Sequence, residues 1–215
     1  TDQSYEGGAS GTTVFFSSAG GGNDVYDGGG GVDTAEFEWG LGDVTFTKNE
    51  ELGTMLVEYG DGNSVTLLNV ERLSFLEDGV YMAFDTNPGD IVYEVHALLN
   101  AWFDGLPETS VLSEWVARAG ELAKRDLGMV ELADEIIGRY SDATFLEPII
   151  TQLFVNIVGA QPDPGLVAAL ATQVGGDKPF KSAGDLFVFG AHLAANTNEI
   201  AGIVGSVVVL DQAYF

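Results

Sequence analysis

Apolar and polar residues alternate in short runs over residues 43–84, which is the period of a β-strand. The clearest runs predict strands at 44–47, 55–59, 64–68 and 73–76. Asp61-Gly62 stands between the second and third runs, and both positions tolerate positive φ, so a tight hairpin is expected there. Glu71 and Arg72 fall next to the last run and are expected at the surface.

From residue 90 onwards the apolar residues recur every three or four positions, which is the period of an amphipathic helix. Four groups of residues form such faces: Val92, Val95, Leu99 and Phe103; Leu112, Val116, Ala119 and Leu122; Met129, Leu132 and Ile136; Ile149, Ile150, Leu153, Phe154 and Ile157. The signals that start helices agree with this period. Thr144 and Glu147 form a capping-box pair, and Asp163 before Pro164 has the residue types of an N-cap and a first helical position.

The two periods meet at Asn-Pro-Gly-Asp, residues 87–90, a cluster that favours a turn. We therefore expect two domains, residues 1–87 with strands and residues 88–215 with helices. The second part carries a weak repeat with a period of about 55 residues, which indicates two degenerate helical copies. Six or seven helices are expected there, including a longer one over residues 180–195.

A nine-residue repeat precedes the predicted strands. Gly-Asn-Asp-Val-Tyr at residues 22–26 recurs as Gly-Val-Asp-Thr-Ala at residues 31–35, and Gly20 is matched by Gly29. Such a unit places a tight glycine turn beside a very short strand, so successive units are expected to wind into a short parallel β-roll. If alternate units stack, the second repeat faces a decayed copy around Thr13.

The repeat also places oxygen atoms together. Glycine permits positive φ and close backbone approach, which exposes carbonyl oxygens, and the aspartate of each unit adds a carboxylate. Calcium takes 6 to 8 oxygen ligands, so an ion would lie between stacked turns. A glycine-rich linker with incidental aspartates is the alternative. A phosphate-binding loop does not fit, because no buried strand precedes Gly20 and no amphipathic helix follows Gly31.

The net charge of the chain also favours a cation as its ligand. The chain has 33 acidic against 8 basic residues and a formal net charge of −25, which argues against nucleic acid as a partner. Many of these acidic residues could equally form a solvated surface. Cysteine is absent, so disulfides and thiolate metal sites are excluded. No apolar run reaches the length of a membrane span, so no transmembrane segment is expected.

The glycine repeat resembles the calcium-binding (hemolysin-type) repeats of the RTX family, which bacteria export by type I secretion. The resemblance implies that Asp24 and Asp33 bind calcium through their carboxylates. It further implies carbonyl ligands from four glycines: Gly20, Gly22, Gly29 and Gly31. The segment 62–75 is similar to the strands that close RTX rolls. Residues 90–196 resemble a helical domain found beside such repeats, itself similar to phycobilisome-linker modules, on the strength of residues 161–166.

Together these features predict an α+β protein with separate halves: a short parallel β-roll with capping strands, then an all-α domain. The expected function is that of a calcium-binding, secreted or cell-surface interaction module of the adhesin or surface-layer kind, whose folding is coupled to calcium. Extracellular protein or polysaccharide is the expected partner class. The alternative is a non-catalytic accessory and type I secretion region of a larger secreted hydrolase. No enzyme activity is expected, because His96 and His192 each stand alone within a helical pattern.

Overall fold

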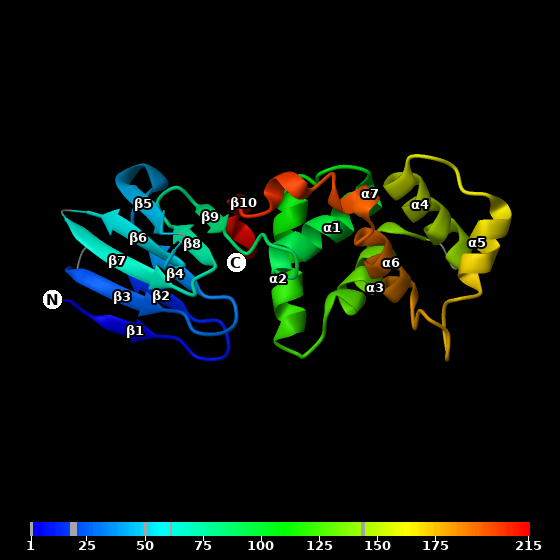
Figure 1. Cartoon of the computed structure of the whole chain (residues 1–215). Helices are drawn as coiled ribbons and strands as arrows, with labels where there is room; N and C mark the ends of the chain where they lie inside the picture. Colours follow the sequence, from blue (N-terminus) through cyan, green and yellow to red (C-terminus); the bar gives the residue numbers. More distant parts are fainter. Residues whose placement is uncertain (1, 18–20, 50, 61, 143–144) are drawn as a thin grey trace. The chain divides into compact units, whose positions relative to one another are not determined.

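The computed structural model describes residues 2–17, 21–49, 51–60, 62–142 and 145–215 (Figure 1). It divides into two compact units. The first unit contains Thr1–Asp85 together with Val207–Phe215, and the second contains Thr86–Ser206. The sequence had placed the last nine residues with the helices, whereas the structure places them with the strands.

Two five-stranded sheets make up the first unit. The first sheet has the order β1 (Ser4–Glu6), β3 (Asn23–Asp27), β7 (Asn63–Leu68), β6 (Thr54–Tyr59) and β5 (Val44–Asn49). The second has the order β10 (Val208–Asp211), β9 (Val80–Ala83), β8 (Arg72–Phe75), β4 (Thr34–Phe37) and β2 (Thr13–Phe16). The chain passes from one sheet to the other between β1 and β2, between β2 and β3, and between β3 and β4. Two short 3-10 helices, η1 (Leu41–Asp43) and η3 (Gln212–Tyr214), flank these strands.

The predicted fold class was wrong. In each sheet three strands pair in parallel, β1-β3-β7 and β2-β4-β8, and the remaining pairs are antiparallel, so both sheets are mixed. The predicted capping strands are members of these same sheets, and no separate parallel β-roll is formed by the described residues. The second half is not all-α either, because β10 follows the helices and pairs with β9. Three successive valines precede Leu210, and β-branched residues favour a strand over the all-α structure expected for residues 88–215.

The parallel strands stack in a regular register. Ser4 pairs with Val25 and Thr13 pairs with Thr34, so the partners in both pairs are 21 residues apart in the sequence. The second pairing confirms that the second glycine repeat stacks on the copy around Thr13. Inward-facing side chains consequently form columns, as in Phe16, Phe37 and Phe75, whose neighbouring ring centroids lie 5.3 and 5.6 Å apart. Buried side chains from both sheets join in one apolar core.

Helices form the second unit. They are α1 (Ile91–Phe103), α2 (Thr109–Ala123), α3 (Met129–Tyr140), α4 (Leu146–Val158), α5 (Pro164–Ala171), α6 (Ala183–Ala191) and α7 (Ala194–Thr197), with a 3-10 turn η2 (Ala201–Ile203). The predicted cap of α5 is confirmed, since the Asp163 side chain accepts hydrogen bonds from the N–H groups of Gly165 and Leu166. Thr144 of the predicted capping box lies outside the described residues. None of the helices in the described ranges is long and apolar enough to cross a membrane.

Candidate cation site

Glycine turns of the first unit stack directly on one another. The turn between β3 and β4 lies against the turn between β1 and β2, where the Gly30 N–H donates to Gly8 O at 2.9 Å. A Cβ added to Gly31 would lie 2.5 Å from the Gly11 nitrogen, and Gly31 has a φ of +102°. Only glycine permits this approach and this backbone conformation. The repeat glycines therefore bring backbone atoms of successive turns into contact.

Asp33 is fully buried beside this stack. Its Oδ1 accepts a hydrogen bond from the Thr12 N–H at 2.7 Å, and the Tyr26 hydroxyl lies 3.5 Å from the same oxygen. Its Oδ2 is buried and has no hydrogen-bond partner among the described residues. Burial raises the pKa of the Asp33 carboxyl, and the negative charge of Asp27 raises that pKa further. A buried carboxylate oxygen without a donor has a strong preference for a proton or a cation.

Glu71 is the second carboxylate at this site. Its Oε2 accepts the Asp33 N–H at 2.9 Å, although the two residues are 38 positions apart. Burial raises the pKa of Glu71, and the charges of Asp33 and Asp85 raise it further. The Asp33 carbonyl in turn accepts the N–H groups of Glu71 and Arg72 at 3.2 and 3.0 Å. These bonds hold the two acidic residues together across adjacent parallel strands.

Arg72, the residue after Glu71, forms a buried ion pair with Asp85. Arg72 is buried, and its Nη2 lies 2.7 Å from Oδ2 of Asp85, which is also buried. Nε and Nη1 of Arg72 have no hydrogen-bond partner in the described part of the chain. The expectation that Arg72 lies at the surface was therefore wrong. All four residues of β8 are buried, and the apolar residues Leu73 and Phe75 that follow Arg72 are the sequence signal that could have placed it inside.

Asp24 occupies the position equivalent to Asp33 in the other sheet. It is buried, and its Oδ1 accepts the Gln3 N–H at 2.8 Å, just as Asp33 accepts the Thr12 N–H. Both bonds join residues 21 positions apart. The two aspartates therefore make equivalent hydrogen bonds, each in a different sheet. The structure places the second carboxylate, Glu71, beside Asp33 and not beside Asp24.

The predicted glycine ligands have separate places. Gly20 lies outside the described residues. Gly22 has a φ of +140°, and its carbonyl accepts the Ser64 N–H at 3.0 Å, so this oxygen already bonds to the neighbouring strand. Gly29 has a φ of +84°, and its N–H donates to Oδ1 of Asp27 at 3.1 Å. Gly29 and Gly31 are exposed and lie in the turn that precedes Asp33.

Carboxylates alone do not complete a metal site here. Across the described ranges, no group of three or more His, Cys, Asp or Glu side chains is arranged to hold a metal ion. Two carboxylates, one with a buried oxygen that lacks a donor, are nevertheless hard oxygen ligands of the type that calcium prefers. Their chemistry is compatible with a hard cation such as calcium, which would need further oxygen ligands from carbonyls or water.

The chain was compared with models of known protein families and with curated proteins. No family model matches the chain. No curated protein matches it.

Proposed function

We propose that this protein is a calcium-responsive interaction module, with the cation held at Asp33 and Glu71 in the first unit. The single observation that carries the proposal is the buried Oδ2 of Asp33, which lacks a hydrogen-bond donor in the described structure and lies in a residue bonded to Glu71. Asp33 and Glu71 would supply carboxylate oxygens, and carbonyls of the glycine turns would supply others. The bound ion would neutralise two carboxylates whose pKa values burial raises.

The charge of the first unit supports this proposal. Lys48 and Arg72 are the only basic residues in its sequence, while more than half of the 33 acidic residues belong to it. Arg72 is already paired with Asp85. Repulsion among the remaining carboxylates opposes the compact state, and a divalent cation relieves it. Stability that depends on calcium suits a protein that functions where calcium is abundant, so we place it outside the cell or at the cell surface.

A binding role is preferred to a catalytic one on the chemistry of the two histidines. His192 has both ring nitrogens engaged, Nε2 with Glu94 at 2.6 Å and Nδ1 with Val188 O at 2.8 Å. His96 is buried within α1, its Nδ1 lies 3.3 Å from Val92 O, and burial lowers its pKa. Neither histidine offers the free, accessible nitrogen of a general base.

The proposal is tested by titrating the protein with calcium at neutral pH and recording binding heat and thermal unfolding. Saturable binding is expected, with a stabilisation of about 2.7 kcal/mol when free calcium exceeds the dissociation constant 100-fold. Asp33→Asn should stabilise the calcium-free protein, because it removes a buried charge, and should abolish the response to calcium. Asp43→Asn is the matched control, because Asp43 is exposed on η1 and should leave the response unchanged.

A different pattern would count against the site. If Asp33→Asn binds calcium as the wild type does, the ion is held elsewhere. If the wild type neither binds calcium nor gains stability at millimolar concentrations, Asp33 is a structural residue only. Its hydrogen bond to Thr12 would then be its whole role.

A further inference from the structure

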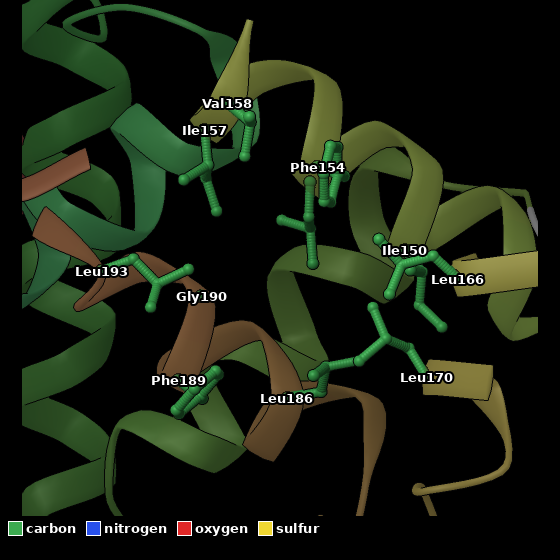
Figure 2. A pocket seen from close by; sticks show the side chains of 11 residues that line it. Ile150, Phe154, Ile157, Val158, Leu166, Leu170, Leu186, Phe189, Gly190 and Leu193 are labelled. Carbon is green, nitrogen blue, oxygen red and sulfur yellow. The ribbon is translucent and has the colours of Figure 1, made fainter. Parts of the chain in front are cut away.

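An apolar pocket opens on the surface of the second unit. It is lined by residues of α4, α5 and α6 and by Leu193, and its volume is about 170 Å³. Figure 2 shows side chains of α4, α5 and α6 around a common space. The lining residues are Ile150, Leu153, Phe154, Ile157, Val158, Leu166, Leu170, Leu186, Phe189, Gly190 and Leu193. Every lining residue is apolar or glycine. We call this feature the α4–α6 groove.

Several large apolar side chains around the groove are exposed. Phe189 is 55% exposed, Val158 50%, Leu166 41% and Leu193 40%. Isolated exposed apolar residues are ordinary, but four that line one pocket form a contiguous patch. Such patches mark binding surfaces, because covering them removes apolar area from water.

Gly190 lines the groove on the α6 side. A Cβ at Gly190 would lie 3.2 Å from Cδ1 of Ile157, so a larger side chain there would occupy part of the space between α4 and α6. Two lining residues, Ile150 and Leu186, also belong to a buried cluster with Val167. The groove is therefore continuous with the apolar core of these helices.

The charged residues on the three helices of the groove are acidic. The sequences of α4, α5 and α6 contain no Lys or Arg. Three acidic residues lie one turn before a lining residue: Glu147 before Ile150, Asp163 at the N-cap of α5 before Leu166, and Asp185 before Phe189. The loop before α6 contains Lys178 and Lys181, and Nζ of Lys181 bonds to carbonyls of that same loop. A partner with basic residues beside an apolar stripe complements this arrangement. A second copy of this chain, with its net charge of −25, would be repelled.

The size of the groove further limits the class of partner that it can bind. A volume of about 170 Å³ is below the roughly 300–1,000 Å³ of small-molecule sites, but it accommodates a large apolar side chain. Apolar grooves between helices receive the apolar face of an amphipathic helix. We infer that the α4–α6 groove binds an amphipathic helix that inserts Leu or Phe and carries Lys or Arg along its flanks. This inference extends the interaction role proposed above, but it does not need calcium, because every lining residue lies in the second unit.

Selection from a peptide library tests the inference. Helical peptides with Leu and Phe on one face and randomised flanking positions are displayed and selected on the full chain, in calcium and in EGTA. Lys and Arg should be enriched at the flanks, and the affinity of the best peptide should be the same in both conditions. Calcium titration tests the first unit separately, so failure of one proposal is distinguishable from failure of the other.

Variants locate the binding surface. Phe189→Glu should weaken the best peptide roughly 30-fold or more, as loss of a central anchor does. Leu193→Glu provides a second groove variant, and circular dichroism checks that both remain helical. Leu106→Glu is the matched control, because Leu106 is 63% exposed in the same unit and does not line the groove. The control should bind within about twofold of the wild type.

Five results would overturn the inference. Three concern the peptides: selection of acidic or neutral flanks, no enrichment above the level found with Phe189→Glu, and equal binding by wild type and both groove variants. A wild-type dimer that Phe189→Glu dissociates is the fourth, and it would assign the groove to a second copy. Binding of wild type to anionic vesicles that Phe189→Glu abolishes would likewise assign it to a lipid surface and overturn the peptide proposal.

Discussion

The two units bury polar groups of different kinds. The first unit buries charged side chains, and the second buries amides and a histidine whose pKa burial lowers. The charged set is Asp24, Asp33, Arg72 and Asp85; the other set is Asn100, Asn156, Asn196 and His96. A neutral amide can be satisfied by hydrogen bonds alone, whereas a buried charge also requires an opposite charge.

Asn196 illustrates the neutral case. Its Nδ2 donates to Ala97 O at 2.9 Å and to Ala191 O at 2.7 Å, and its Oδ1 accepts from Nδ2 of Asn100 at 2.9 Å. Asp33 illustrates the charged case, with a buried oxygen that lacks a donor in the described part of the molecule. The first unit should therefore respond to cations and gain stability from protons, whereas the second should be insensitive to calcium and lose stability when its buried histidine must take up a proton.

Removing the buried positive charge of Arg72 should have the largest effect on stability. Arg72→Met leaves Asp85 buried without its ion-pair partner, so the first unit should lose about 3–5 kcal/mol of unfolding free energy. Arg118→Met is the matched control, because Arg118 and Glu135 pair at 2.6 Å with side chains 38% exposed. Because that pair is exposed and screened by water, its loss should lower the unfolding free energy of the second unit far less. Urea unfolding measures how much unfolding free energy each variant loses. Similar losses in the two variants would show that the buried charge of the first unit is no more important than an exposed ion pair of the second.

A smaller effect concerns pH. In calcium-free protein the raised pKa values of Asp33 and Glu71 mean that the folded first unit binds protons before the unfolded chain does. The stability of the first unit should therefore rise as the pH falls from neutral towards about 4, the ordinary range of carboxyl pKa values, and this gain is lost as the pH rises through the raised pKa values. Burial lowers the pKa of His96, so the unfolded chain binds that proton first, and the second unit should lose stability as pH falls below about 6.5.

Urea titrations followed by NMR at amides of each unit measure these opposite slopes. Asp33→Asn should flatten the slope of the first unit and leave the second unaffected. Parallel slopes in the two units would show that their buried groups do not control stability in the way proposed. Saturating calcium should also flatten the slope of the first unit, because the ion and protons compete for the same carboxylates.

Local patterns of the sequence predicted many elements but not their arrangement. Strands expected at 55–59 and 64–68 correspond to β6 and β7, because alternation and turn residues are local properties. The mixed sheets depend on which distant strands pair, and local periodicity does not contain that information. The strand β10 shows the limit most clearly, since its partner β9 is more than a hundred residues away.

The candidate site was predicted in the same partial way. The nine-residue spacing identified Asp24 and Asp33 as equivalent residues, and their matching bonds to Gln3 and Thr12 are consistent with that equivalence. Glu71 was missed because it reaches Asp33 only through parallel pairing of β4 with β8. The glycine register predicted the stacked turns, but not which backbone oxygens bond to neighbouring strands.

We propose that the first unit alone responds to calcium, through Asp33. Amide hydrogen exchange, measured residue by residue with and without calcium, distinguishes this from a general effect of the ion. In calcium we expect slower exchange across the first unit, including the Thr12 and Asp33 amides that donate to Asp33 and Glu71, and unchanged exchange in α1 to α6. Unchanged exchange at Thr12 and Asp33, or equal protection in both units, would show that calcium does not act through Asp33.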